Sequence, residues 1–146
     1  MRDPVQVTLR VTLVDPPPGV LFGVQSGKAG VLSAVRSNGA SLSFDFPGEL
    51  RPGKDGEPVL YGPHAQGPPA ERFIYVNSGA MAGDAADWQR RAKIPLRGLT
   101  WELADEALRT PGAVLAAHIA GKAKDGGPVC ASIPLLPPGW HVEQPA

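Results

Sequence analysis

Apolar and polar residues alternate over residues 5–14, near the start of the chain. The apolar positions of this stretch are Val5, Val7, Leu9, Val11 and Leu13. Successive side chains of a β-strand point to opposite faces, so this period of two predicts a strand with one face in a core and the other in water. Three prolines follow at residues 16–18 and end the strand, because proline donates no backbone hydrogen bond.

Shorter stretches of similar character predict further strands, separated by segments rich in glycine and proline. Residues 47–58 and 78–89 are expected to be loops, and residues 31–36 are ambiguous. One helix is expected over about residues 100–109, where Thr100 can cap the first turn and Glu102 suits the helix dipole. The other expected strands cover residues 20–25, 41–46, 59–61, 71–77, 93–97, 113–120 and 128–135.

The content of glycine and proline supports a fold made of many short strands. The chain has 18 glycines and 17 prolines, about twice the usual share, and they are spread along its length. We therefore predict a mainly β fold: a single-domain antiparallel β-sandwich or partly closed β-barrel with about seven to nine short strands and one short helix. Periodicity does not report strand order, so it cannot separate sandwich from barrel. The predicted domain covers residues 1–136, and residues 137–146 are predicted to be a C-terminal tail that Trp140 can fasten to it.

The composition excludes several classes of function. The 14 Lys and Arg residues balance 14 Asp and Glu residues, so no overall charge attracts nucleic acid or an anionic membrane. The single cysteine, Cys130, can form neither an intramolecular disulfide nor a cysteine-based zinc cluster. The three histidines, His64, His118 and His141, are far apart with no metal-ligand spacing, so neither a metal nor a cofactor is expected. No signal peptide or membrane span is recognisable, which favours the cytoplasm.

Four stretches of the chain together resemble a known family. They cover residues 17–25, 66–75, 91–96 and 125–128, and the second, with the sequence QGPPAERFIY, is the most specific. In order and spacing they resemble the uncharacterised bacterial family catalogued as domain of unknown function 5990, and the similarity covers most of the chain. The resemblance implies a bacterial, single-domain protein, and it implies no reaction, ligand or catalytic residue.

The stretch from Gln66 to Tyr75 is the strongest candidate for a ligand site. It places an amide, a carboxylate, a guanidinium and a phenol within ten residues, on backbone stiffened by two prolines. The guanidinium of Arg72 can clamp a carboxylate or phosphate through two hydrogen bonds, while Gln66 and Tyr75 orient the ligand. The structural alternative is that Arg72 pairs with Glu71 or Asp45 and fastens a strand to its loop. The candidate ligand-binding residues are Gln25, Gln66, Glu71, Arg72, Tyr75 and Arg91.

Other motifs carry less chemistry. The basic residues between Arg90 and Arg97, with Trp88 just before them, can meet an anionic ligand or RNA, but a solvated edge strand protected by positive charge explains the same pattern. The glycine-rich residues 23–30 lack the hydroxyl that a phosphate loop carries after Gly-Lys, so they predict a turn. No nucleophile elbow occurs, and we interpret Cys130 as a small buried apolar residue and His118 as a satisfied, half-buried histidine.

The sequence thus predicts a non-enzymatic binding or interaction domain for a small anionic ligand or a peptide, since stiff loops are where β folds place their sites. One alternative is an enzyme whose site forms only in three dimensions, with Arg72 as anion clamp and Tyr75 or His118 as acid or base. Another is a subunit of a larger assembly, which would expose a contiguous apolar patch. Enzymatic activity is left open, and neither nucleic acid nor a membrane is expected as a partner.

Overall fold

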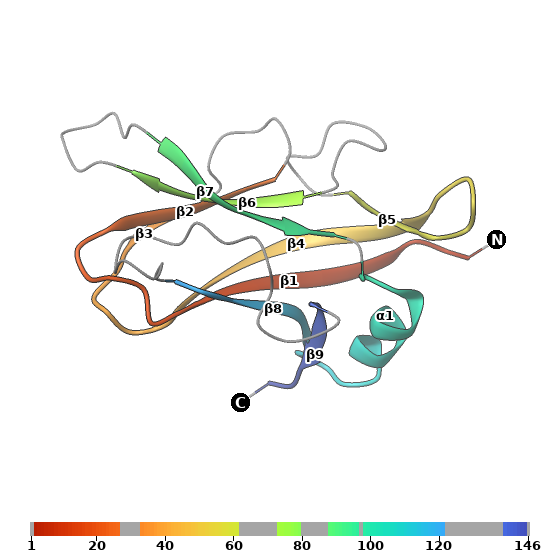
Figure 1. Cartoon of the computed structure of the whole chain (residues 1–146). Coiled ribbons are helices and arrows are strands. Elements are labelled where there is room, and N and C mark those ends of the chain that lie inside the picture. The colour runs from red at the N-terminus through yellow and green to blue at the C-terminus, as the bar shows by residue number, and fades with distance from the viewer. Residues whose placement is uncertain are drawn as a thin grey trace.

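The structure, a computed structural model, describes residues 2–26, 33–61, 73–79, 88–96, 98–121 and 139–145. Within these ranges the chain forms nine strands in two sheets and one helix. The sheets lie one over the other, and the helix packs against strands of the five-stranded sheet (Figure 1). The described part of the chain therefore forms the sandwich of the two predicted architectures, because its two sheets do not close into a barrel.

The five-stranded sheet is built around the first strand. Its strands are β1 (Val5–Val14), β4 (Leu42–Pro52), β5 (Pro58–Tyr61), β8 (Val114–Ala120) and β9 (His141–Glu143). They are arranged in the order β5-β4-β1-β8-β9, and every neighbouring pair is antiparallel except β1 with β8. That parallel pair departs from the antiparallel prediction. A parallel pair needs a long crossover connection rather than a hairpin, so no turn signal in the sequence announces it.

The four-stranded sheet is antiparallel throughout. Its strands are β2 (Leu21–Ser26), β3 (Ser33–Arg36), β6 (Phe73–Gly79) and β7 (Trp88–Pro95). They follow the order β3-β2-β6-β7, and the register between β6 and β7 shifts between Val76 and Asn77. The ambiguous residues 31–36 thus include a short strand, and the strand expected over residues 93–97 begins earlier, at Trp88.

Both sheets contribute to one apolar core. On β1 the buried residues include Leu9, Val11 and Leu13, each with no exposed surface, as the alternating pattern predicts. The four-stranded sheet supplies residues such as Phe22 and Ile74 to the same cluster. The buried residues of β1 and β4 face this core, and the alternate residues of these two strands lie on the outward face of the five-stranded sheet.

Helix α1 (Trp101–Leu108) confirms the predicted helix. Its N-cap is Thr100, whose Oγ1 accepts a hydrogen bond from Leu103 N at 3.2 Å. Trp101 fastens the helix to the β4–β5 hairpin by donating from Nε1 to Gly56 O at 2.8 Å, and the Arg2 guanidinium lies 4.3 Å from its ring centre. In the described residues no helix is both long and apolar enough to cross a membrane.

Two segments differ from the predictions. Strand β4 continues to Pro52, into the first part of the loop predicted over residues 47–58, because its partner β1 is ten residues long and holds it extended as far as Leu50. The predicted tail contains β9, and Trp140 just before it is only 1% exposed, so this segment is part of the sheet and core. The strand expected over residues 128–135 lies outside the described residues.

Candidate functional site

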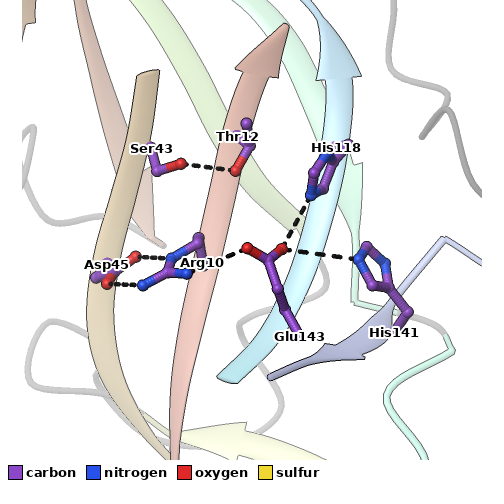
Figure 2. A network of polar contacts seen from close by, with 7 residues as sticks. All are labelled: Arg10, Thr12, Ser43, Asp45, His118, His141 and Glu143. Carbon is purple, nitrogen blue, oxygen red and sulfur yellow. Dashed lines mark hydrogen bonds and ion pairs between the residues drawn. The ribbon is translucent and has the colours of Figure 1, made fainter. Parts of the chain in front are cut away.

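The outward face of the five-stranded sheet carries cross-strand polar pairs. The register places Arg10 opposite Asp45 and Thr12 opposite Ser43. Arg10 donates from Nε to Asp45 Oδ1 at 2.7 Å and from Nη2 to Asp45 Oδ2 at 2.9 Å, which makes a bidentate ion pair. The hydroxyl oxygens of Thr12 and Ser43 lie 2.8 Å apart (Figure 2). These two pairs hold the outward-facing polar side chains of β1 and β4 in place.

Strands β8 and β9 bring two histidines and a glutamate to the same face. The parallel register with β1 places His118 next to Thr12. The register between β8 and β9 places His141 next to Ala116, and Glu143, two residues further along β9, points to the same side. Ala116 has no exposed surface although it belongs to the outward face, so larger side chains cover it.

Glu143 lies at the centre of this cluster (Figure 2). Its Oε1 accepts a hydrogen bond from Arg10 Nη1 at 3.2 Å. Its Oε2 lies 3.0 Å from His118 Nε2 and 3.8 Å from His141 Nε2. The two imidazole rings have centres 5.1 Å apart and planes inclined at 48°. One ligand atom from each of His118, His141 and Glu143 therefore falls within 4.8 Å of the others, an arrangement suited to holding a metal ion.

Neighbouring groups lower the pKa of Glu143 and burial lowers the pKa of His141, which favours the protonation states that bind a metal ion. The hydrogen bond from His118 is the largest cause that lowers the pKa of Glu143, and Arg10 adds to it against the effect of burial. Burial lowers the pKa of His141, and His118 lowers it further, which outweighs the opposite effect of Glu143. The carboxylate partners raise the pKa of Arg10. At neutral pH Glu143 is thus ionised, His141 is neutral and Arg10 is charged.

The cluster is reachable from solvent. The side chains of His118 and His141 are each 29% exposed, and that of Glu143 is 33% exposed. His141 Nδ1 is buried and has no hydrogen-bond partner among the described residues. An ion would therefore approach His141 from its Nε2 side, where Glu143 also lies.

A pocket of about 400 Å³ opens on the same part of the sheet, beside the end of α1. It is lined in part by Thr8 and Val114, and also by Leu108 and Thr110 at the end of the helix. Thr8 precedes Arg10 by two residues on the same face of β1, and Val114 is the ladder partner of Glu143. The pocket and the cluster are thus neighbours.

The structure places only part of the site that the sequence predicts. Gln66, Glu71 and Arg72 lie outside the described residues. Gln25 on β2 and Tyr75 on β6 are ladder partners, so the fold brings these two together. Arg91 on β7 is half-buried and donates from Nε to Ser78 Oγ at 2.7 Å.

Tyr75 and His118, the two alternatives for an acid or base beside Arg72, lie on different sheets. Tyr75 stands between the buried Ile74 and Val76, so it points away from the core on the four-stranded sheet. His118 points outward from the other sheet. The expectation that His118 is half-buried and satisfied is confirmed, since it contacts Glu143.

Sequence reasoning missed Arg10, His141 and Glu143. The histidines are far apart along the chain and so predict no metal site, yet strand pairing brings His118 and His141 together. One local signal existed: His141 and Glu143 alternate with Val142, the spacing of two ligands on one face of a strand. That signal fell in a segment interpreted as a tail.

The fold and the cluster define a β-sandwich domain with a His-His-Glu group on the outward face of one sheet. The chain belongs to the family described as Family of unknown function (DUF5990), whose model matches residues 7–143. This confirms the family resemblance seen in the sequence. No curated protein and no solved structure matches the chain.

Proposed function

We propose that this protein is a binding domain for a divalent transition-metal ion, held by His118, His141 and Glu143. The observation that carries the proposal is the convergence of three ligand atoms within 4.8 Å of one another. Ligand atoms of a four-coordinate zinc ion, with bonds of ~2.1 Å, lie ~3.4 Å apart. The distances from Glu143 Oε2 to the two histidine nitrogens, 3.0 and 3.8 Å, fall on either side of that value.

The type of ligand selects the type of ion. Two imidazoles and one carboxylate suit zinc and its transition-metal neighbours, whereas magnesium and calcium prefer shells made of oxygen atoms. We therefore expect Zn²⁺ or Co²⁺ to bind and Mg²⁺ not to compete.

Arg10 and Asp45 support this role by positioning the glutamate. Arg10 is held by Asp45 through two hydrogen bonds and contacts only Oε1 of Glu143. Oε2 therefore stays directed at the histidines, as metal-binding carboxylates commonly are when a second group binds their other oxygen. The carboxylates of Asp45 and Glu143 outnumber the guanidinium of Arg10, so these three groups carry a net negative charge that suits a cation.

Titration calorimetry with ZnCl₂ tests the proposal. Wild-type protein is expected to bind one equivalent, and Glu143→Gln and His141→Ala are each expected to bind more than about 10-fold more weakly. The matched control is Glu49→Gln, a carboxylate of the same sheet that pairs with Arg51 and should bind zinc like the wild type. Absence of zinc binding by the wild type, or equal affinity in Glu143→Gln, would overturn the proposal.

A thermal melt separates ion binding from a purely structural cluster. Zinc at about 100 times its Kd is expected to stabilise the wild type by about 2.7 kcal/mol, a rise in Tm of about 6–10 °C. Glu143→Gln should show no such rise. If the cluster only fastens β9 to the sheet, Glu143→Gln lowers the Tm and zinc changes neither protein, which contradicts ion binding.

We also propose a cellular location for the protein and the absence of enzymatic activity. We place the protein in the bacterial cytoplasm, supported by the family resemblance and by a chain with one cysteine. We regard it as non-enzymatic, because the charged groups of the cluster are held in hydrogen bonds with one another.

A further inference from the structure

The pocket beside the cluster lacks charge of its own. The described residues that line it include no Asp, Glu, Lys, Arg or His side chain. Its walls combine apolar groups such as Val114 and Pro47 with the polar side chains of Gln6, Thr8 and Thr110. Such a surface suits an uncharged organic body that carries one or two hydrogen-bonding groups.

The end of α1 adds a preference for hydrogen-bond donors. Leu108 and Thr110, at the C-terminal end of the helix, line the pocket. The negative end of the helix dipole lies here, and the last turn of α1 carries no basic side chain; the C-cap Arg109 is exposed and does not line the pocket. The dipole therefore favours an N–H or O–H group of a ligand at this end over an anionic group.

A bound metal ion would supply the missing anion site. Three protein ligands leave at least one coordination position open for water or an added ligand. The two positive charges of the ion also reverse the balance of the cluster, where two carboxylates face one guanidinium in its absence. The site then attracts an anion only when the ion is present.

The pocket and the cluster adjoin on the five-stranded sheet, as one small molecule spanning both requires. Thr8 and Arg10 are separated by ~7 Å along β1, the rise of two strand residues. Glu143 is the ladder partner of Val114, which lines the pocket. A volume of about 400 Å³ is at the lower end of the range for small-ligand pockets.

We infer that the site takes a small carboxylate whose charged group completes the coordination of the ion and whose uncharged, N–H-bearing body lies in the pocket. This inference rests on the proposed function, because the carboxylate needs the ion. The ligand and the ion then increase each other's affinity by the same factor.

Hippurate (N-benzoylglycine) is a suitable probe, since it combines a carboxylate with an uncharged body and one N–H. Its binding is measured by NMR titration of zinc-loaded and metal-free protein. We expect hippurate to bind the loaded form at least about 10-fold more tightly than the metal-free form, and its uncharged glycinamide analogue to lose that gain. The variant Glu143→Gln with zinc in solution controls for ion that is not bound to the protein.

A pocket-filling variant tests the second half of the inference. Thr8→Trp places a large side chain in the pocket, and Val14→Trp, at the other end of the same outward face, is the matched control. Thr8→Trp should keep its affinity for zinc and for acetate, and should bind hippurate at least about 10-fold more weakly than Val14→Trp does.

The outcomes separate the two proposals. No zinc binding overturns the proposed function and this inference together. Zinc binding with no binding of hippurate overturns the inference alone. Equal binding of hippurate to the metal-free protein, or equal binding by Thr8→Trp and Val14→Trp, also overturns it.

Discussion

Gly121 ends β8 where the chain meets the connection between β1 and β2. Its N–H donates to Val14 O at 2.9 Å, and the residue is buried. A Cβ added at Gly121 would lie 2.8 Å from Pro16 Cα and 2.9 Å from Pro16 N and Cβ. Carbon atoms in contact are ~3.5–4.0 Å apart, so Gly121→Ala requires two backbone segments to separate by at least about 0.7 Å. Gly121 does not have a positive φ, so the cost is steric.

The loss of stability in Gly121→Ala depends on whether the atoms near the added Cβ can move away. Overpacking costs about 1–3 kcal/mol, and the upper part of that range applies because the backbone of Pro16 cannot rotate away. Alanine also restricts the unfolded chain, which offsets about 0.4–1 kcal/mol. We therefore expect Gly121→Ala to lower the free energy of unfolding by about 2 kcal/mol and the Tm by about 4–8 °C.

Gly48→Ala is the matched comparison. Its added Cβ would lie 2.7 Å from Leu60 Cδ1, but that atom is the end of a side chain on the edge strand β5. Rotation of Leu60 relieves the contact, so the expected loss is under about 1 kcal/mol. Urea unfolding followed by circular dichroism measures both, with the midpoints compared at equal m-values. A steric cost at Gly121 is refuted if Gly121→Ala lowers the free energy of unfolding by less than about 0.5 kcal/mol, or if Gly48→Ala lowers it by as much as Gly121→Ala does.

Two further predictions concern α1. Thr100→Ala removes the cap that binds Leu103 N and is expected to cost about 1 kcal/mol in thermal melts, whereas Thr100→Ser should cost less. The hydrogen bond from Arg2 lowers the pKa of Asp105 below its ordinary 3.8, so its stabilisation is complete above about pH 5 and is lost as pH falls through the folded-state pKa. The stability difference between wild type and Asp105→Asn, measured by urea unfolding, should therefore shrink in acid; a difference that grows would contradict the assignment.

The pattern of apolar and polar residues predicts those strands whose structure depends mainly on their own residues. Strand β1 has the predicted bounds because five alternating apolar residues specify it without help from a partner. Strand β4 was predicted only as far as Phe46, since Pro47 and Gly48 interrupt its pattern and the pairing with β1 overrides their weak strand preference. Strand β9 has three residues and depends on β8 for its structure, so its sequence alone carries too little information.

The candidate site was harder to predict because it too depends on contacts between residues that are far apart in the sequence. Gln25 and Tyr75 were grouped from the sequence and are ladder partners, but the contact between Arg10 and Glu143 spans 133 residues. No periodicity reports a contact at that separation, because it depends on strand order. The spacing of His141 and Glu143 was visible, but it indicates a site only once β8 is known to supply His118 beside them.

The parallel pairing of β1 with β8 has a consequence for folding. It joins an early strand to a late one, and β9 can then pair only with the outer edge of β8. The pairing of β1 with β8, for example Leu9 with Leu115, closes the longest loop of any strand pair in the described residues, so we expect it to form later and more slowly than the β4–β5 hairpin. If the protein binds zinc as proposed, we expect a refolding chain to take up the ion only after this non-local step, so zinc binding would report completed folding.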